Sequence, residues 1–169
     1  MKNKYIQYYV EGETEVKLIN VLKTELKVIR AGKVQKMNVV DNMFTDARLM
    51  TLRAGTIVVL VFDTDTGNVD TLNKNLEKLR KCSAISEIVT IPQNPNLEGE
   101  LVYSCAIKSI RELLDSKSNE KFKSDIIRTT NLTSKLMRHD FDIKKFWSHD
   151  PPSLYKGIKN MADKIRLIG

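Results

Sequence analysis

A run of apolar and β-branched residues at positions 56–62, TIVVLVF, limits the possible folds of this chain more than any other stretch. After Thr56 the run contains no polar residue, so it predicts a strand that is covered on both of its faces. Strands of this kind are found in parallel sheets that lie between two layers of helices. The sequence therefore predicts an α/β protein with a buried strand at residues 56–62.

Weaker patterns on either side of this run complete an alternation of strands and helices. Residues 5–10 are aromatic and β-branched, as in a strand, and from Glu13 onward apolar residues recur at the spacing of an amphipathic helix. The other expected elements are strands at 37–40 and 86–91, the latter stopped by Pro92, and helices at 44–53 and 68–81. This order predicts a four-stranded, mostly parallel sheet between helices, with right-handed crossovers.

The alternation stops after Pro92, and the remaining residues are predicted to be helical. The expected helices cover residues 98–114, 121–128, 132–138, 143–146 and 154–167. We therefore expect an α/β unit over residues 1–92 and a helical C-terminal part over residues 93–169 that packs on it. A chain of 169 residues is long enough for one such compact domain with a sizeable core.

Charge and hydropathy indicate the kind of partner and the compartment. The formal net charge is +7 and the sequence pI is near 9.4, which favours a polyanionic partner such as DNA or RNA. No apolar run approaches the roughly 20 residues that span a bilayer, and the N-terminal sequence contains an acid too early for a secretory signal. We therefore expect a cytoplasmic protein with no membrane partner.

Acidic residues follow directly on two of the expected strands. Glu11 comes after residues 5–10, and Asp63 and Asp65 come after residues 56–62. Each acid alone is also explained by a helix N-terminal charge or a solvated turn. Ligands bind beyond the carboxyl ends of parallel strands, however, so the acids of both motifs can reach one ion. Hard oxygen donors of this kind favour Mg²⁺ or Mn²⁺, which take further ligands from water and phosphate.

These motifs, EGETE and LVFDTDTGN, resemble the Toprim domain of topoisomerases, bacterial primases and several nucleases. The family pattern is Glu-Gly after the first strand and Asp-x-Asp after the third, and the resemblance covers residues 4–92. The form Val-Glu-Gly-x-Thr-Glu is most similar to the OLD-type and RloB-like nucleases of phage defence. The resemblance implies a Toprim-like sheet and a metal-dependent nuclease, in which Glu11, Glu15, Asp63 and Asp65 bind the metal.

Under this resemblance each residue of the motifs has an expected role. Asp63 and Asp65 would hold a Mg²⁺ ion on the scissile phosphate, and Glu11 would be a second ligand or a general acid or base. Gly12 would let the backbone pass close to the metal or phosphate. Asn94-Pro95 followed by Glu98 resembles the Asn-Pro-x-x-Glu region of RloB-like proteins. Glu98 is therefore a further candidate ligand, although a helix N-terminal acid is an equally good interpretation.

A second group of candidates lies near the C-terminus. Lys145 and Lys156, with Phe146 and Trp147 nearby, could contact the backbone and bases of a nucleic acid. The alternative, in which the two aromatic residues only anchor the C-terminal part on the core, is favoured.

Cysteine and histidine are too few to indicate another kind of metal site. Cys82 and Cys105 form no CxxC or Cys/His cluster, so neither a zinc site nor a disulfide is expected. His139 and His149 each precede an aspartate, as in His-Asp metal hydrolases, but such sites need more histidines than these two.

Several functions stay open at this stage. The chain has no Gly-x-x-x-x-Gly-Lys-Ser/Thr phosphate loop, so an ATPase or another defence-system partner would be a separate protein. A structured-RNA processing nuclease is a further possibility, although such Toprim maturases carry Lys and Asp after Glu-Gly and a proline inside Asp-x-Asp. A non-catalytic module that binds metal or nucleic acid, or a subunit of a larger complex or oligomer, is the alternative of a different class.

Overall fold

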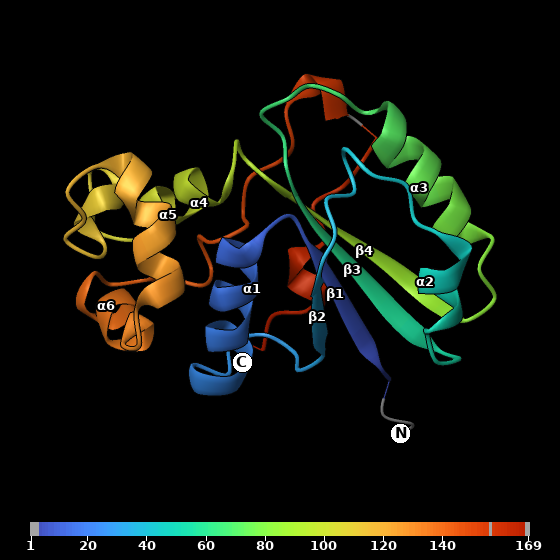
Figure 1. Cartoon of the computed structure of the whole chain (residues 1–169), viewed down its shortest axis with the longest axis horizontal. Helices are drawn as coiled ribbons and strands as arrows, with labels where there is room; N and C mark the ends of the chain where they lie inside the picture. Colours follow the sequence, from blue (N-terminus) through green and yellow to red (C-terminus); the bar gives the residue numbers. More distant parts are fainter. Residues whose placement is uncertain (1–3, 156, 168–169) are drawn as a thin grey trace.

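The computed structural model describes residues 4–155 and 157–167 of the chain. At its centre lies a four-stranded sheet in the order β2-β1-β3-β4, with every strand parallel to its neighbours (Figure 1). The strands are β1 (Ile6–Val10), β2 (Lys33–Lys36), β3 (Thr56–Asp63) and β4 (Ile85–Gln93). The predicted fold class is therefore confirmed, with four parallel strands between helices and a helical C-terminal part.

Helices cover both faces of this sheet, and Figure 1 shows α2 and α3 on one side with α1, α4, α5 and α6 on the other. The α-helices are α1 (Glu13–Asn20), α2 (Asp46–Met50), α3 (Asp70–Arg80), α4 (Leu97–Ser104), α5 (Asn119–Arg128) and α6 (Leu132–Arg138). A π-helical turn, η1 (Val21–Glu25), extends α1, and the 3₁₀ turns are η2 (Ile110–Glu112), η3 (Ser153–Tyr155) and η4 (Ala162–Lys164). No helix among the described residues is long and apolar enough to cross a membrane.

The alternate side chains of β3 explain why its sequence is apolar throughout. Ile57, Val59 and Val61 pack in the larger hydrophobic cluster, which contains α1, α4, α5 and the segment around Trp147. The intervening residues Val58, Leu60 and Phe62 pack in the smaller cluster, with α2 and α3. Because β3 also pairs with both β1 and β4, the strand is enclosed on all sides. The boundary that we expect at residue 92 remains a prediction.

The second strand was predicted in the wrong place. It occupies Lys33–Lys36 instead of residues 37–40, and most of its side chains are exposed. β2 is an edge strand that pairs with β1 through its backbone. Because most of its side chains face solvent, the strand does not need apolar residues. Val39 and Val40 are buried, but they belong to the loop between β2 and α2.

The prediction that Pro92 stops the fourth strand was also wrong. Pro92 lies within β4 and pairs with Phe62, and the strand continues to Gln93. A proline can occupy this position because β4 is the other edge of the sheet, where a missing N–H group breaks no ladder.

The C-terminal part contains fewer helical residues than expected. The predicted helix 98–114 ends at Ser104, and residues 143–146 form turns. The described residues of 154–167 contain only the 3₁₀ turns η3 and η4. Hydrogen bonds between distant segments replace helical ones, since Ala106 N–H donates to His139 O and Asp142 N–H donates to Ser104 O. Apolar spacing alone could not reveal these bonds.

Asn75 on α3 anchors the loop between β2 and α2. The side chain is fully buried, and its Oδ1 accepts a hydrogen bond from Phe44 N–H at 2.9 Å. Its Nδ2 donates to Val39 O at 2.9 Å and to Asn42 O at 2.8 Å. One amide therefore fixes three points of a loop that has no regular secondary structure.

Asn75→Ala is expected to lower the free energy of unfolding by about 2–3 kcal/mol, because the loop N–H and carbonyl groups would lose their buried partners. Urea unfolding followed by circular dichroism measures this loss. Asn73→Ala on the exposed face of the same helix is the matched control and should change the free energy by less than about 0.5 kcal/mol. Equal losses in the two variants would show that the buried amide has no special role.

Candidate metal centre and substrate pocket

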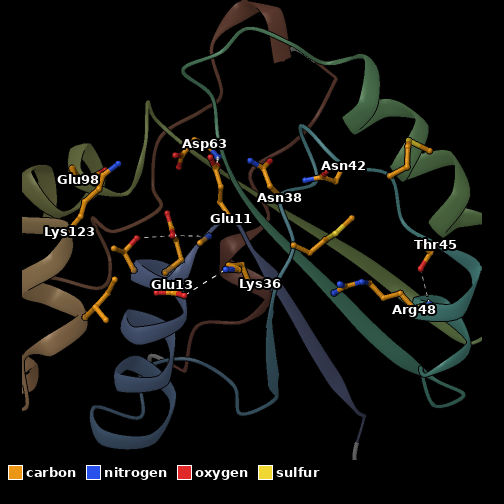
Figure 2. A pocket seen from close by; sticks show the side chains of 16 residues that line it. Glu11, Glu13, Lys36, Asn38, Asn42, Thr45, Arg48, Asp63, Glu98 and Lys123 are labelled. Atoms are coloured by element: carbon orange, nitrogen blue, oxygen red, sulfur yellow. Dashed lines mark hydrogen bonds and ion pairs between the residues drawn. The ribbon is translucent and has the colours of Figure 1, made fainter. Parts of the chain in front are cut away.

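A cavity of about 810 Å³ lies at the carboxyl ends of the strands (Figure 2). One wall is acidic and comes from residues 11–15, from the end of β3 and from Glu98 of α4. The opposite wall comes from Lys36 and from the loop and helix that follow β2. Lys123 and Ile127 of α5 complete the lining.

Glu11 and Asp63 meet at the centre of the acidic wall. Glu11 follows β1 directly, Asp63 is the last residue of β3, and these two strands are neighbours in the sheet. The backbone N–H of Asp63 donates a hydrogen bond of 3.0 Å to Glu11 Oε2. The order of the strands therefore brings together two acids that are 52 residues apart in sequence.

Glu15 lies close to this pair, but its carboxylate is already engaged. The side chain is buried, and its Oε2 accepts hydrogen bonds from Gly12 N–H at 3.1 Å and from Thr14 Oγ1 at 2.9 Å. Glu15 therefore caps the first turn of α1, which is a structural role for an acid at a helix N-terminus. Its charge nevertheless contributes to the field around Glu11 and Asp63.

Burial and mutual repulsion raise the pKa values of both central carboxyls. Loss of hydration is the largest cause for Asp63, and the charges of Glu11, Glu15 and Asp65 add to it and raise its pKa to about 8. The pKa of Glu11 is also raised, mainly by burial, although the hydrogen bond from Asp63 N–H opposes the shift. Ionisation of these two carboxyls therefore costs free energy when no cation is bound.

Asp65 and Glu98 lie at the periphery of the acidic wall. Asp65 is exposed in the loop after β3 and does not line the cavity, although its charge reaches Glu11 and Asp63. Glu98 does line the cavity, near the start of α4, and its Oε1 lies 3.9 Å from Lys123 Nζ. Across the described residues, no lysine or arginine forms a salt bridge with Glu11, Glu15, Asp63 or Asp65.

The donors present fit a hydrated divalent cation better than a closed metal cage. Within residues 4–155 and 157–167, no group of three or more His, Cys, Asp and Glu side chains is arranged to hold a metal ion. Mg²⁺ commonly needs only one or two carboxylates, because it keeps several waters and takes ligands from phosphate. Glu11 and Asp63 supply such a pair, and neither forms a salt bridge with a lysine or arginine of the described residues.

Three further predicted residues have less support from the geometry. Gly12 lines the cavity but has extended backbone angles, with φ at −152°, so this conformation does not require glycine. Lys145 is exposed and lies outside the cavity lining, and Lys156 falls outside the described residues. Phe146 and Trp147 are buried in the larger cluster, in agreement with the packing interpretation.

The wall opposite the acids was not predicted. It carries the cations Lys36 and Arg48, the amides Asn38 and Asn42, and the exposed side chain of Met43. This wall was missed because the second strand was predicted at residues 37–40. Had the strand been assigned to Lys33–Lys36, the residues that follow it would have been expected at the same edge as Glu11.

Comparisons with protein-family models, with curated proteins and with solved structures find no match for this chain. The resemblance to Toprim proteins therefore remains an expectation from the motifs. The chemistry of the site has to be argued from its own residues.

The pKa of Asp63 predicts how the metal-free protein responds to pH. Between 3.8, its ordinary value, and about 8, the folded protein retains a proton that the unfolded chain releases. The free energy of unfolding should therefore fall as pH rises through this window. Asp63→Asn should flatten the dependence and stabilise the protein at pH 8 by at least about 1.4 kcal/mol, the value of one pKa unit.

Urea unfolding in EDTA across this pH range measures the effect. Asp150→Asn is the control, because Asp150 is exposed and its substitution should leave the slope unchanged. Parallel curves for wild type and Asp63→Asn would contradict the assignment of a strained, buried carboxyl.

Proposed function

We propose that this protein is a nuclease that depends on Mg²⁺ or Mn²⁺ and hydrolyses phosphodiester bonds of DNA or RNA in the cavity described above. The proposal is carried by the pair Glu11 and Asp63, which is partly buried, joined by a hydrogen bond and surrounded by further acids. A divalent cation would stabilise the ionised form of both carboxyls, and a cation held there could receive a phosphate.

Glu11 and Asp63 would be the main protein ligands, with Asp65 and Glu15 contributing if their carboxylates turn toward the ion. The bound cation would polarise a phosphate oxygen and acidify a bound water. Because Asp63 N–H holds Oε2 of Glu11, the other oxygen of Glu11 remains available to a ligand or to a proton. The pKa of Glu11 is raised above the usual range of a glutamate, which favours a group that exchanges a proton during hydrolysis.

The opposite wall supplies the contacts that a nucleic-acid backbone requires. Lys36 and Arg48 are cationic, and Asn38 and Asn42 can donate hydrogen bonds to phosphate oxygens (Figure 2). The phosphates next to the scissile one would lie along this wall, while the acids approach the reacting phosphate from the other side. The net charge of +7 supports a polyanionic substrate.

The biological setting is proposed from the motifs alone. Val-Glu-Gly-x-Thr-Glu supports a cytoplasmic nuclease of phage defence or of a mobile element, similar to the OLD-type and RloB-like proteins. A separate ATPase or another defence protein would then be its partner, and the active form could be an oligomer.

A second candidate function is a non-catalytic module that binds metal or nucleic acid. One observation favours it, since Glu15 is turned toward the backbone of α1 and leaves the acidic wall with only two central ligands. Binding of Mg²⁺ and nucleic acid without any cleavage would support this second function.

Glu11→Gln and Asp63→Asn are each expected to lower the cleavage rate by at least about 100-fold, because each removes a metal ligand or a proton acceptor. The measurement is a cleavage panel on single- and double-stranded DNA and RNA, with Mg²⁺ or Mn²⁺ and with EDTA. Glu13→Gln is the matched control, because Glu13 lines the same cavity but is exposed and pairs with Lys36 at 3.7 Å. Unchanged turnover in both test variants would eliminate the proposed mechanism.

Arg48→Ala is expected to weaken binding of a single-stranded oligonucleotide and to make the slope of log K against log salt shallower by about one, because one phosphate is then no longer neutralised. Mg²⁺ binding, measured by calorimetry, should not change, because Arg48 lies on the wall opposite the acids. Arg80→Ala, at the exposed end of α3, is the control for the removal of one positive charge. An equal loss of affinity in the two variants would indicate binding by net charge only.

A further inference from the structure

A chain of two hydrogen bonds connects Asp63 with the C-terminal part of the protein. Gln93 Nε2 donates to Asp63 Oδ1 at 2.8 Å, and Trp147 Nε1 donates to Gln93 Oε1 at 3.1 Å. Asp63 and Gln93 are the last pair of residues that face each other across β3 and β4. Gln93 and Trp147 are both buried, so the bond between them is shielded from water, whereas Asp63 is half-buried and lines the cavity.

The two neighbours of Gln93 fix the orientation of its amide. The indole Nε1–H of Trp147 can only donate, so it requires the amide oxygen of Gln93. The ionised carboxylate of Asp63, the form that binds a cation, can only accept, so it requires the amide nitrogen. Rotation of the amide by half a turn would place donor against donor at one end and acceptor against acceptor at the other. Trp147 thereby ensures that an N–H group points at Asp63.

Trp147 is itself held in an unusual backbone conformation. Its φ is 60°, in the left-handed region that bulky residues seldom adopt. Its N–H donates to Oε2 of the buried Glu100 at 3.1 Å, and its carbonyl accepts from Asn160 Nδ2 at 2.8 Å and from Arg166 Nη2 at 2.9 Å. Such a conformation persists where the surroundings determine it, and here three polar side chains do so.

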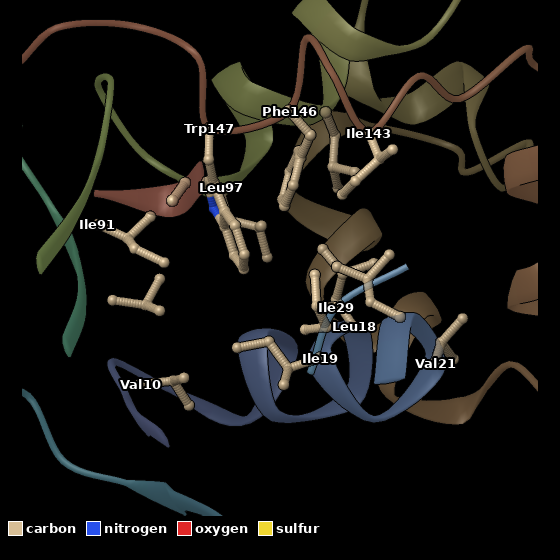
Figure 3. Packing of buried hydrophobic residues seen from close by; sticks show 14 of the residues in the cluster. Val10, Leu18, Ile19, Val21, Ile29, Ile91, Leu97, Ile143, Phe146 and Trp147 are labelled. Atoms are coloured by element: carbon tan, nitrogen blue, oxygen red, sulfur yellow. The ribbon is translucent and has the colours of Figure 1, made fainter. Parts of the chain in front are cut away.

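The indole ring is enclosed by the larger hydrophobic cluster. Figure 3 shows Trp147 beside Leu97 and Phe146, above the layer formed by α1. The ring centroids of Phe146 and Trp147 lie 4.6 Å apart. Apolar packing around the indole and hydrogen bonds to the backbone of Trp147 therefore together fix the position of the indole Nε1–H group.

We propose that Gln93 and Trp147 are positioning residues of the metal centre. They hold Oδ1 of Asp63 at the end of β3 and leave its second oxygen to bind the cation. Partners of this kind fix the geometry of a metal ligand without touching the metal. The inference rests on the proposed function to the extent that it takes Asp63 to be a metal ligand, and it makes the C-terminal part a component of the site.

The same chain of bonds provides a direct readout. Trp147 is the only tryptophan in the protein, so tryptophan emission, excited where tyrosine does not absorb, reports on its indole alone. Binding of Mg²⁺ at Asp63 should alter the bond to Gln93 and thereby change the emission. The change should be absent in Asp63→Asn.

Gln93→Leu tests the role of the amide, since leucine has a similar size and no hydrogen-bonding group. The affinity for Mg²⁺, measured by calorimetry, should fall by about 10- to 100-fold, the usual effect of losing a partner of a metal ligand. The emission change on adding Mg²⁺ should disappear. Wild-type affinity in this variant would overturn the proposal.

Trp147→Phe tests the second bond and serves also if Gln93→Leu does not fold, because it keeps an aromatic ring at this position. Its Mg²⁺ affinity should fall as well, since the amide of Gln93 is then free to rotate. Phe146→Leu is the matched control, which disturbs the packing of the ring but removes no hydrogen bond of the chain. It should lose stability in urea and keep its Mg²⁺ affinity. An equal loss of affinity in Phe146→Leu would reduce the role of Trp147 to packing and overturn the proposal.

Cleavage assays on the same variants separate this inference from the proposed nuclease function. If Mg²⁺ affinity depends on Gln93 but the wild type cleaves no nucleic acid, the positioning role stands and the nuclease function fails. If wild type and Gln93→Leu bind Mg²⁺ and cleave equally well, the nuclease function stands and the positioning role fails.

Discussion

The hydrogen bond from Asp63 N–H to Glu11 Oε2 ties together the ends of the two central strands. Because β1 and β3 are neighbours and parallel, their carboxyl ends meet at one edge of the sheet, and each delivers an acid there. Burial then makes the charge of these acids costly, and Glu15 and Asp65 increase the cost. The acidic wall of the cavity, the raised pKa values of its carboxyls and the expected need for a cation all follow from the adjacent ends of β1 and β3.

The cavity has two walls of different origin and opposite character. The acids stand on the ends of strands, where hydrogen bonds of the sheet restrict their movement. The cations Lys36 and Arg48 and their neighbouring amides come from the edge strand and from the loop and helix after it. This division matches the demands of phosphodiester hydrolysis, in which a rigid centre must act on one phosphate while other groups hold the adjacent backbone.

The sequence revealed those parts of the molecule in which local composition determines structure. Residues 56–62 were recognised as a strand because both of its faces are buried, and β3 extends this range by only one residue. β2 was misplaced because an exposed edge strand carries no apolar signal, and the basic wall was overlooked with it. The acids Glu11 and Asp63 could be identified by their positions after strands. Gln93 and Trp147 could not, since only the folded chain brings the indole next to the last residue of β4.

The anchoring of the β2–α2 loop by Asn75 also bears on how such a protein could diversify. The amide forms hydrogen bonds with backbone groups, at Val39, Asn42 and Phe44. These bonds do not depend on which side chains the loop carries. Evolution, or a protein engineer, can therefore exchange Asn42 and Met43 for other residues while the path of the chain is preserved, whereas Asn38 itself accepts hydrogen bonds from the loop N–H groups of Val40 and Asp41. The residues of the reactive centre and those that recognise a substrate could then change independently. The former lie at the ends of the strands, and the latter lie in a loop that α3 holds in place.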